Sequence, residues 1–187
     1  MKRQKYRPGA FVKIDLPNNR LAFGRLLPGI ASRMSVYDFI AFEMDTLSFI
    51  DLIAEKNVLF SVGIYRDIIT KGTFEIIGYK ELSKDEIARI PPTFTQDLAN
   101  ITNCKLSRIG GEDLLAIPEE CVGLERASVW EAAAVIQRIE DHYNNKKNFY
   151  VELNKVILSR DDPRYMAGPN LKWSFEEEKF YNTRASE

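Results

Sequence analysis

The stretch LPNNRLAFGRLL, residues 16–27, decides the fold of the N-terminal part of the chain. Two apolar runs flank the turn PNNR, and asparagine tolerates the positive φ angles that tight hairpins require. The preceding run AFVKIDL, residues 10–16, alternates between apolar and polar side chains, as a half-buried strand does. The sequence therefore predicts a β-hairpin that turns at residues 17–20.

The returning strand of this hairpin contains Gly24 and Arg25 in its interior. A glycine in mid-strand often marks a β-bulge or the close approach of another backbone or aromatic ring. We expect Arg25 on the outer face of the strand, where its guanidinium can reach a carboxylate. Two interpretations stay open: a structural arginine that shapes the strand, or an arginine that binds a ligand or a partner protein.

The remaining apolar runs up to Leu82 predict a meander of about five strands. SVYDFIAFE, residues 35–43, is apolar on both faces and is typical of a central strand. LSFIDLIAEKN, residues 47–57, changes to helical spacing and predicts a short helix. VLFSVGIYRDII, residues 58–69, and TFEIIGYKEL, residues 73–82, predict a second hairpin about Lys71-Gly72.

The second half of the sequence mixes short strands with helical signals. Ser83 and Glu86 stand at capping-box spacing and predict one helical turn. TNCKLSRI and DLLAIPEE predict a third hairpin about Gly110-Gly111. SVWEAAAVIQRIEDHYNNKKN, residues 128–148, is the clearest helical pattern, with a capping box at Ser128 and Glu131.

These elements together predict an α+β fold. We expect an antiparallel, strongly twisted β-meander or partial barrel of about five to seven strands, with one long C-terminal helix packed on it. FYVELNKVIL, residues 149–158, predicts a further strand. Residues 6–160 are expected to form a single domain, and residues 161–187 a C-terminal extension that is either docked or disordered.

Composition excludes several classes of partner. The chain of 187 residues is 45% hydrophobic and carries a net charge of −1, which is no electrostatic footprint for nucleic acid. Charged residues interrupt the N-terminal apolar run that a signal peptide needs. No apolar stretch approaches the roughly 20 residues of a membrane span. We expect a soluble cytoplasmic protein without nucleic-acid or membrane partners; its oligomeric state stays open.

The residue types of catalytic and metal sites are scarce. His142 is the only histidine, and Cys104 and Cys121 are the only cysteines. Hydrolytic zinc sites and Ser or Cys triads draw on histidines, and three soft ligands at no familiar spacing do not predict a metal site. Gly-rich nucleotide-binding motifs and the GxSxG nucleophile motif are absent from the sequence. We therefore expect no catalytic residue, no metal and no cofactor.

The segment YRPGAFVKIDLPNNRLAFGRLL resembles the opening of the immunity protein 26 family of bacterial polymorphic toxin systems. Members of that family begin with Gly-Asp and an apolar strand, followed by a Leu-Pro-Asp-Gly-like turn and an aromatic-Gly-Arg triplet. In this sequence Ala10 replaces the acid and Asn18-Asn19 replaces Asp-Gly. The positions that match are Gly9, Leu16, Pro17, Arg20, Phe23, Gly24 and Arg25.

Two later motifs extend the resemblance to roughly residues 6–100. FEIIG, which ends at Gly78, is similar to the family's second-half strand. PPTFTQD, residues 91–97, is similar to its closing P-P-x-F-x-Q-D. The resemblance implies that Gly9, Pro17, Arg20, Phe23, Gly24, Arg25 and Gly78 are structural residues of the family scaffold.

The resemblance also implies a function. An immunity protein binds a cognate toxin in the cytoplasm of the producing cell and neutralises it by protein–protein inhibition, without catalysis. The toxin-binding residues are not identified by the sequence. The alternative is a hydrolase of phosphotriester-type substrates, because some members of the family carry that label. A single histidine fits poorly with a histidine-rich dinuclear metal site.

Overall fold

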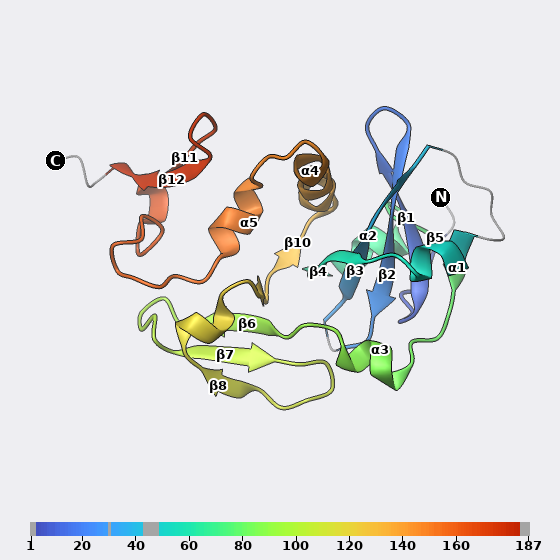
Figure 1. Ribbon diagram of the computed structural model, residues 1–187, viewed down its shortest axis with the longest axis horizontal. Helices are drawn as coiled ribbons and strands as arrows, with labels where there is room; N and C mark the ends of the chain where they lie inside the picture. Colours follow the sequence, from blue (N-terminus) through green and yellow to red (C-terminus); the bar gives the residue numbers. More distant parts are fainter. Residues whose placement is uncertain (1–2, 30, 43–48, 184–187) are drawn as a thin grey trace. The chain divides into compact units, whose positions relative to one another are not determined.

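The computed structural model describes residues 3–29, 31–42 and 49–183 (Figure 1). Twelve strands and five α-helices lie within these residues, and the α+β class is confirmed. The chain divides into two compact units, Met1–Pro91 with Ser128–Glu140 and Pro92–Ala127 with Asp141–Glu187. Their limits do not coincide with residues 6–160 and 161–187, and that domain assignment stays a prediction.

A six-stranded sheet with the order β10-β4-β3-β2-β1-β5 forms the first unit. Strands β1 to β4 are consecutive antiparallel neighbours, β5 pairs with β1, and β10 pairs in parallel with β4. β5 and β10 therefore form the two edges, and the described strands do not close into a barrel. The strand bounds are β1 (Ala10–Leu16), β2 (Arg20–Leu27), β3 (Arg33–Ala41), β4 (Val58–Ile64), β5 (Glu75–Tyr79) and β10 (Val129–Trp130).

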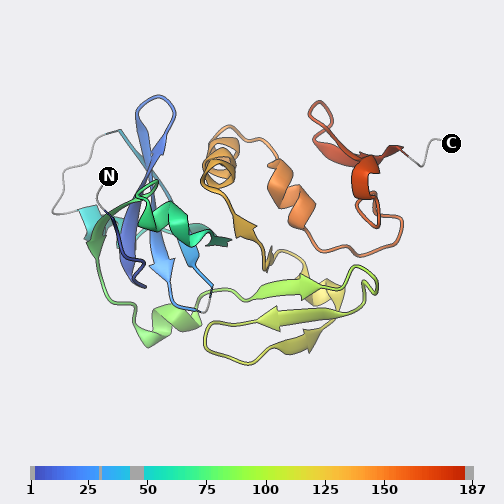
Figure 2. The same cartoon turned by 180° about the vertical axis from the view of Figure 1, so that it is seen from behind.

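The hairpin of β1 and β2 turns where the sequence predicts. Leu16 is opposite Arg20, and Asn18 and Asn19 have φ angles of 60° and 56°. Three residues, Pro17 to Asn19, therefore connect the paired positions, and the left-handed angles of the two asparagines reverse the chain within this short turn. The prediction of a hairpin at residues 17–20 is confirmed, and Figures 1 and 2 show its twist from both sides.

Gly24 lies at a β-bulge and at a close approach between strands, as expected of a mid-strand glycine. The register between β2 and β3 shifts between Ala22 and Gly24. A Cβ atom on Gly24 would lie 2.6 Å from Sδ of Met34 and 3.0 Å from the carbonyl oxygen of Ser35. Because Met34 is fully buried, it has little room to move away.

Two short helices of this unit lie within the ranges that local signals predict. α1 (Phe49–Ala54) buries Ile53 against a core cluster that contains Phe11 and Tyr37. α3 (Lys84–Ala88) follows a capping box, in which Ser83 and Glu86 exchange side-chain hydrogen bonds with each other's backbone N–H. Residue 43 of the predicted third strand and residues 47–48 of the predicted first helix lie outside the described residues.

The predicted second hairpin is wrong. β4 ends at Ile64, and the next residues form the helix α2 (Arg66–Thr70), which buries Ile68 and Ile69. The Gln4 side chain donates to the carbonyl oxygens of Ile69 and Phe74 and accepts from the N–H of Ile76. The side-chain amide of Gln4 therefore satisfies backbone groups of α2, of β5 and of the segment that joins them. β5 itself pairs with β1 and not with β4.

The prediction of one long C-terminal helix over residues 128–148 is also wrong. α4 (Ala132–Tyr143) has 12 residues, and the two residues of β10 come before it. Ser128 lies before β10 and not next to the first residue of the helix, and its Oγ accepts a hydrogen bond from Nε1 of Trp130. The β-branched and aromatic pair Val129-Trp130 favours a strand, and pairing with β4 satisfies its backbone. The guanidinium of Arg138 in α4 lies 3.9 Å from the ring centre of Phe60 in β4.

The second unit contains a four-stranded sheet with the order β8-β7-β6-β9. β7 and β8 are antiparallel, which confirms the predicted third hairpin. Gln96 orders the core beside this sheet, because its amide donates to Ile101 and Ile157 and accepts from Ile157 and Arg126. The bounds are β6 (Thr93–Gln96), β7 (Cys104–Ser107), β8 (Leu114–Ala116), β9 (Glu125–Arg126) and the 3₁₀ turn η1 (Pro118–Cys121).

The C-terminal residues of this unit form a helix and a small hairpin. The predicted strand at 149–158 is wrong, because Asn148 caps the helix α5 (Phe149–Asn154) through a hydrogen bond from the N–H of Val151. A 3₁₀ turn, η2 (Gly168–Asn170), precedes the strands β11 (Leu171–Ser174) and β12 (Lys179–Asn182). Their aromatic rings, Trp173 and Phe180, lie 5.8 and 5.3 Å from the ring of Phe149. None of the helices in the described ranges is long and apolar enough to cross a membrane.

Replacing Gly24 by alanine is expected to lower the free energy of unfolding by about 1–3 kcal/mol, because the new methyl group overlaps Met34 in a packed core. Urea denaturation measures the loss. The control is Gly111→Ala, where the nearest atom, Cβ of Arg108, is 3.4 Å away. Equal stability of the two variants would contradict the close approach of β3 to β2.

Candidate functional site

Arg25, the residue that the sequence leaves between two interpretations, is buried and forms a network of contacts within the first unit. Its side chain is 3% exposed, so the expectation that it lies on an outer face is wrong. Nη1 donates to Oε1 of Glu86 at 2.6 Å. Nη2 donates to the carbonyl oxygens of Lys80 and Glu81 at 2.9 and 3.1 Å. The guanidinium carbon also lies 4.9 Å from the ring centre of Phe11.

The contacts of Arg25 join three segments of the chain. Its backbone belongs to β2, its carbonyl acceptors follow β5, and Glu86 belongs to α3. A planar guanidinium offers several donors in a fixed geometry, which suits this combination of one carboxylate and two carbonyls. Burial leaves the group no surface for a ligand or a partner protein. This geometry supports the structural interpretation of Arg25.

Glu86 receives hydrogen bonds from two directions. Its Oε2 accepts from the N–H of Ser83 at 2.7 Å, while Oε1 accepts from Arg25. The backbone hydrogen bond from Ser83, reinforced by Arg25, lowers the pKa of Glu86 to about 2, although partial burial opposes the shift. The carboxylate is therefore ionised at neutral pH, and it holds the start of α3 to Arg25.

Two glycines of the family motif lie where another segment passes closely. Gly9 has a φ angle of +89°, and a Cβ atom there would lie 2.6 Å from the carbonyl oxygen of Lys80. Its own carbonyl oxygen accepts from the N–H of Lys80 at 3.1 Å. Gly78 in β5 faces the Ile50 side chain of α1, whose Cδ1 occupies the space that a Cβ atom would take. Both positions favour a residue without a side chain.

The other motif residues lie at the hairpin and in the core. Arg20 donates from Nε to the carbonyl oxygen of Pro17 at 3.3 Å, and its Nη2 lies 2.6 Å from Oε2 of Glu140 in α4. Phe23 is fully buried beside Phe39, with ring centres 5.8 Å apart. These contacts place a turn, a helix and a core ring around the same sheet. None of them joins a nucleophile to a base.

The scarce catalytic residue types are not assembled into a site. His142 is exposed at the end of α4 and makes an edge contact with the ring of Tyr143. Cys104 and Cys121 lie together in the core of the second unit, where burial raises the pKa of Cys121 to about 11. A thiol with that pKa is a poor nucleophile at neutral pH. No group of three or more His, Cys, Asp or Glu side chains in the described residues is arranged to hold a metal ion.

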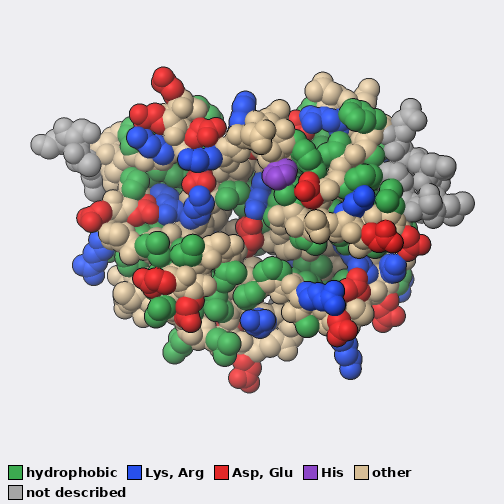
Figure 3. Space-filling view, in the orientation of Figure 1, with side chains coloured by type: hydrophobic (Ala, Val, Ile, Leu, Met, Phe, Trp, Pro, Cys, Tyr) green, Lys and Arg blue, Asp and Glu red, His purple; other side chains and the backbone are tan. Residues whose placement is uncertain are grey.

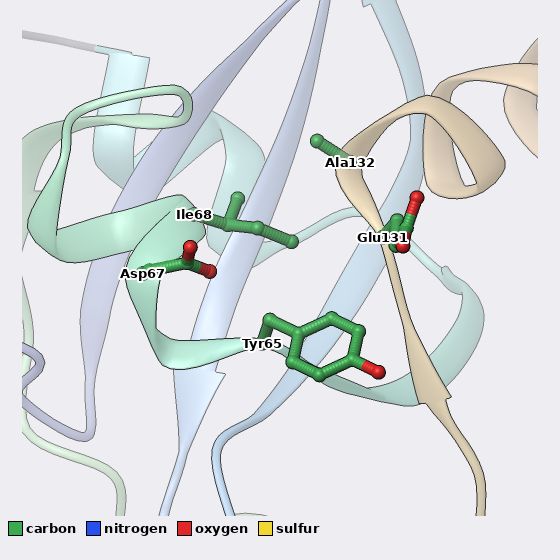
Figure 4. A pocket seen from close by; sticks show the side chains of 5 residues that line it. All are labelled: Tyr65, Asp67, Ile68, Glu131 and Ala132. Atoms are coloured by element: carbon green, nitrogen blue, oxygen red, sulfur yellow. The ribbon is translucent and has the colours of Figure 1, made fainter.

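A shallow pocket of about 390 Å³ opens between α2 and the start of α4 (Figure 4). Tyr65, Asp67 and Ile68 line one side, and Glu131 and Ala132 line the other. A hydrogen bond from Lys71 lowers the pKa of Asp67, so this carboxylate is charged at neutral pH. Two carboxylates and an aromatic ring suit a cationic side chain. The sequence reasoning missed this pocket because it treated residues 58–69 as one strand.

Comparison with known families identifies one match. The model of the family described as immunity protein 26 matches residues 7–105, more than half of the chain. The matched range contains the whole network of Arg25. It also contains the seven residues that the resemblance assigns to the scaffold: Gly9, Pro17, Arg20, Phe23, Gly24, Arg25 and Gly78. No curated protein and no solved structure matches the chain.

Replacing Arg25 by methionine is expected to lower the free energy of unfolding by about 2–4 kcal/mol, because the carbonyl oxygens of Lys80 and Glu81 and the Glu86 carboxylate lose their donor. Thermal and urea unfolding measure the loss. Arg89→Met is the matched control, since Arg89 is exposed at the end of the same helix α3. A stability loss no larger than that of the control would show that the network contributes nothing.

Glu86 is expected to make the stability depend on pH in the acid range. Its pKa is about 2 in the folded chain against an ordinary value of 4.5, so its stabilising contribution is complete above about pH 4.5 and is lost as the pH falls toward 2. The Glu86→Gln variant should therefore lose this part of the dependence in denaturation curves recorded from pH 2 to pH 7. Glu81→Gln, at an exposed position nearby, serves as the control. Parallel curves for wild type and Glu86→Gln would contradict the assignment.

Proposed function

Because the chain belongs to the immunity protein 26 family, we propose that it binds and neutralises a cognate toxin of a bacterial polymorphic toxin system. The family match over residues 7–105 is the observation that carries this proposal. The partner is a toxin protein, and the encounter takes place in the cytoplasm of the cell that produces both. Neutralisation follows from occupation of a toxin surface, with no chemical step on this chain.

The construction of the first unit supports a role as a binding scaffold. An inhibitor that presents a preorganised surface loses less conformational entropy on binding than one that must order its segments first. Arg25 holds the β5–α3 connection against β2, and Arg20 holds the hairpin turn to α4. The motif residues fit this role, since they lie in the hairpin turn, at close approaches between segments, in ion pairs or in the core of the unit. We propose that they build the scaffold and do not contact the toxin.

No observation favours the alternative of a phosphotriester hydrolase. Such an enzyme needs a metal site or an activated nucleophile, and histidine is the usual ligand or base. The one histidine of the chain is exposed and its neighbours among the described residues include no metal-binding cluster. The membership of an immunity-protein family likewise suggests a role without catalysis.

Co-expression with the toxin domain encoded by the adjacent gene tests the proposed function. The full chain is expected to restore growth of bacteria that the toxin domain alone arrests, and the two purified proteins should form a stable complex. Titration of toxin activity in vitro should reach its end point at one equivalent of this chain, because inhibition by binding is stoichiometric. Absence of a complex, or neutralisation by far less than one equivalent, would contradict inhibition by binding.

A further inference from the structure

One edge of the second unit exposes a concentration of apolar side chains. We call it the β8 surface and define it by β8, the 3₁₀ turn η1 and the residues that flank them, 112–122. Leu115 is 86% exposed, which is far more than a leucine in a packed sheet. The other exposed apolar side chains are Leu114 (55%), Ile117 (54%) and Val122 (59%). Apolar side chains gathered in so short a segment are a feature of protein interfaces.

The β8 surface also contains an open strand edge. β8 is the terminal strand in the order β8-β7-β6-β9, so only one of its two sides is paired by a described strand. Proteins usually protect such an edge with lysine, proline or a bulge within the strand. β8 has the sequence Leu-Leu-Ala and carries none of these, and Pro118 comes only after it ends. Its outer edge is therefore able to pair with a further strand.

The segment that carries these apolar side chains is rich in negative charge, while the neighbouring strand β7 places the exposed Lys105 opposite Leu115. Residues 111–124 contain four carboxylates and no lysine or arginine. Each of the four is exposed, and none has an ion-pair partner in the described part of the chain. Figure 3 shows acidic side chains, with a basic one nearby, next to hydrophobic ones on the surface over β8 and η1. The four carboxylates are Glu112, Asp113, Glu119 and Glu120.

The four carboxylates favour one of two possible partners for the open edge of β8, a second copy of this chain or a different protein. A second copy of this chain would bring eight carboxylates to one interface, and like charges brought together in an interface are costly. A partner with lysine or arginine beside an extended apolar segment would meet opposite charge and apolar contact at once. The β8 surface therefore fits a basic partner and disfavours self-association.

We propose that the β8 surface docks an extended, basic strand of the cognate toxin, which adds to the four-stranded sheet at β8. The inference rests on the proposed function and names the contact face for it. Leu115 is the apolar anchor of the contact, backbone hydrogen bonds of β8 set the register, and the four carboxylates attract the basic strand. The surface lies beyond residue 105, where the family match ends. The shared scaffold and the partner-specific face are thus separate parts of the chain.

Binding of the full chain to the toxin domain encoded by the adjacent gene, measured by calorimetry, tests the inference. Leu115→Glu is expected to weaken binding by about 30-fold or more, the loss typical of a central apolar anchor. The control is Leu158→Glu, which changes a leucine that is 55% exposed elsewhere in the same unit. Because both leucines are exposed, both variants should fold, and their circular dichroism and melting temperature are compared with wild type.

Two further measurements separate strand addition from a general apolar contact. Hydrogen exchange should show new protection in the complex of those amides among residues 114–116 that face away from β7, because a new strand pairs with that edge. The double variant Glu112→Lys and Glu119→Lys should weaken binding and reduce its dependence on salt, because favourable charge contacts are screened. Neither of these two carboxylates has a described hydrogen bond whose loss would disturb the fold.

The outcomes are distinguishable. Wild-type binding that is lost in Leu115→Glu and kept in Leu158→Glu, with protection at 114–116, supports the inference. Wild-type binding that Leu115→Glu leaves unchanged overturns the inference alone and leaves the proposed function standing. A dimer of the free chain that Leu115→Glu dissociates assigns the edge to a second copy and overturns the inference. Absence of wild-type binding overturns the proposed function and the inference with it.

Discussion

The buried guanidinium of Arg25 is the constraint on which the first unit depends. A charged group that is removed from water must find partners, and Arg25 finds them in Glu86 and in two backbone carbonyls of the β5–α3 connection. These bonds also constrain the β5–α3 connection, because it must pass close to β2 for Lys80 and Glu81 to accept from Arg25. Gly9 allows that passage, since its missing side chain leaves room for the carbonyl of Lys80. One ion pair and one glycine together determine how β5 and α3 return to the hairpin.

The core of the second unit contains a buried amide and two buried thiols. Gln96 satisfies the backbone of two distant segments, and two buried thiols fill the space beside Phe94. In its four-stranded sheet β8 is a terminal strand, so one edge of β8 pairs with β7 and no described strand pairs with the other edge. A protein that works by binding needs both properties: a core that holds its shape and an edge that the fold leaves available. Under the proposed docking, the carboxylates of residues 112–120 favour a basic partner strand.

Local signals in the sequence were sufficient for several elements. The two asparagines of PNNR dictate the β1–β2 turn, because few other residues accept two consecutive left-handed φ angles. Ser83 and Glu86 determine the start of α3 through bonds within one helical turn. The paired glycines after β7 permit the hairpin with β8. In the candidate site, Gly24 indicated the β-bulge. The sequence also predicted a carboxylate partner for Arg25, but it did not identify that partner as Glu86.

What the sequence by itself determined is therefore the set of turns, caps and strands whose causes lie within a few residues, together with the family motif. The tertiary structure alone decided where long-range partners meet. Gln4 satisfies the backbone that would have paired in a second hairpin, and β4 draws Val129 and Trp130 into a strand. Burial of Arg25 and exposure of Leu115 are decided in the same way, because pairing and burial depend on segments far apart in the chain.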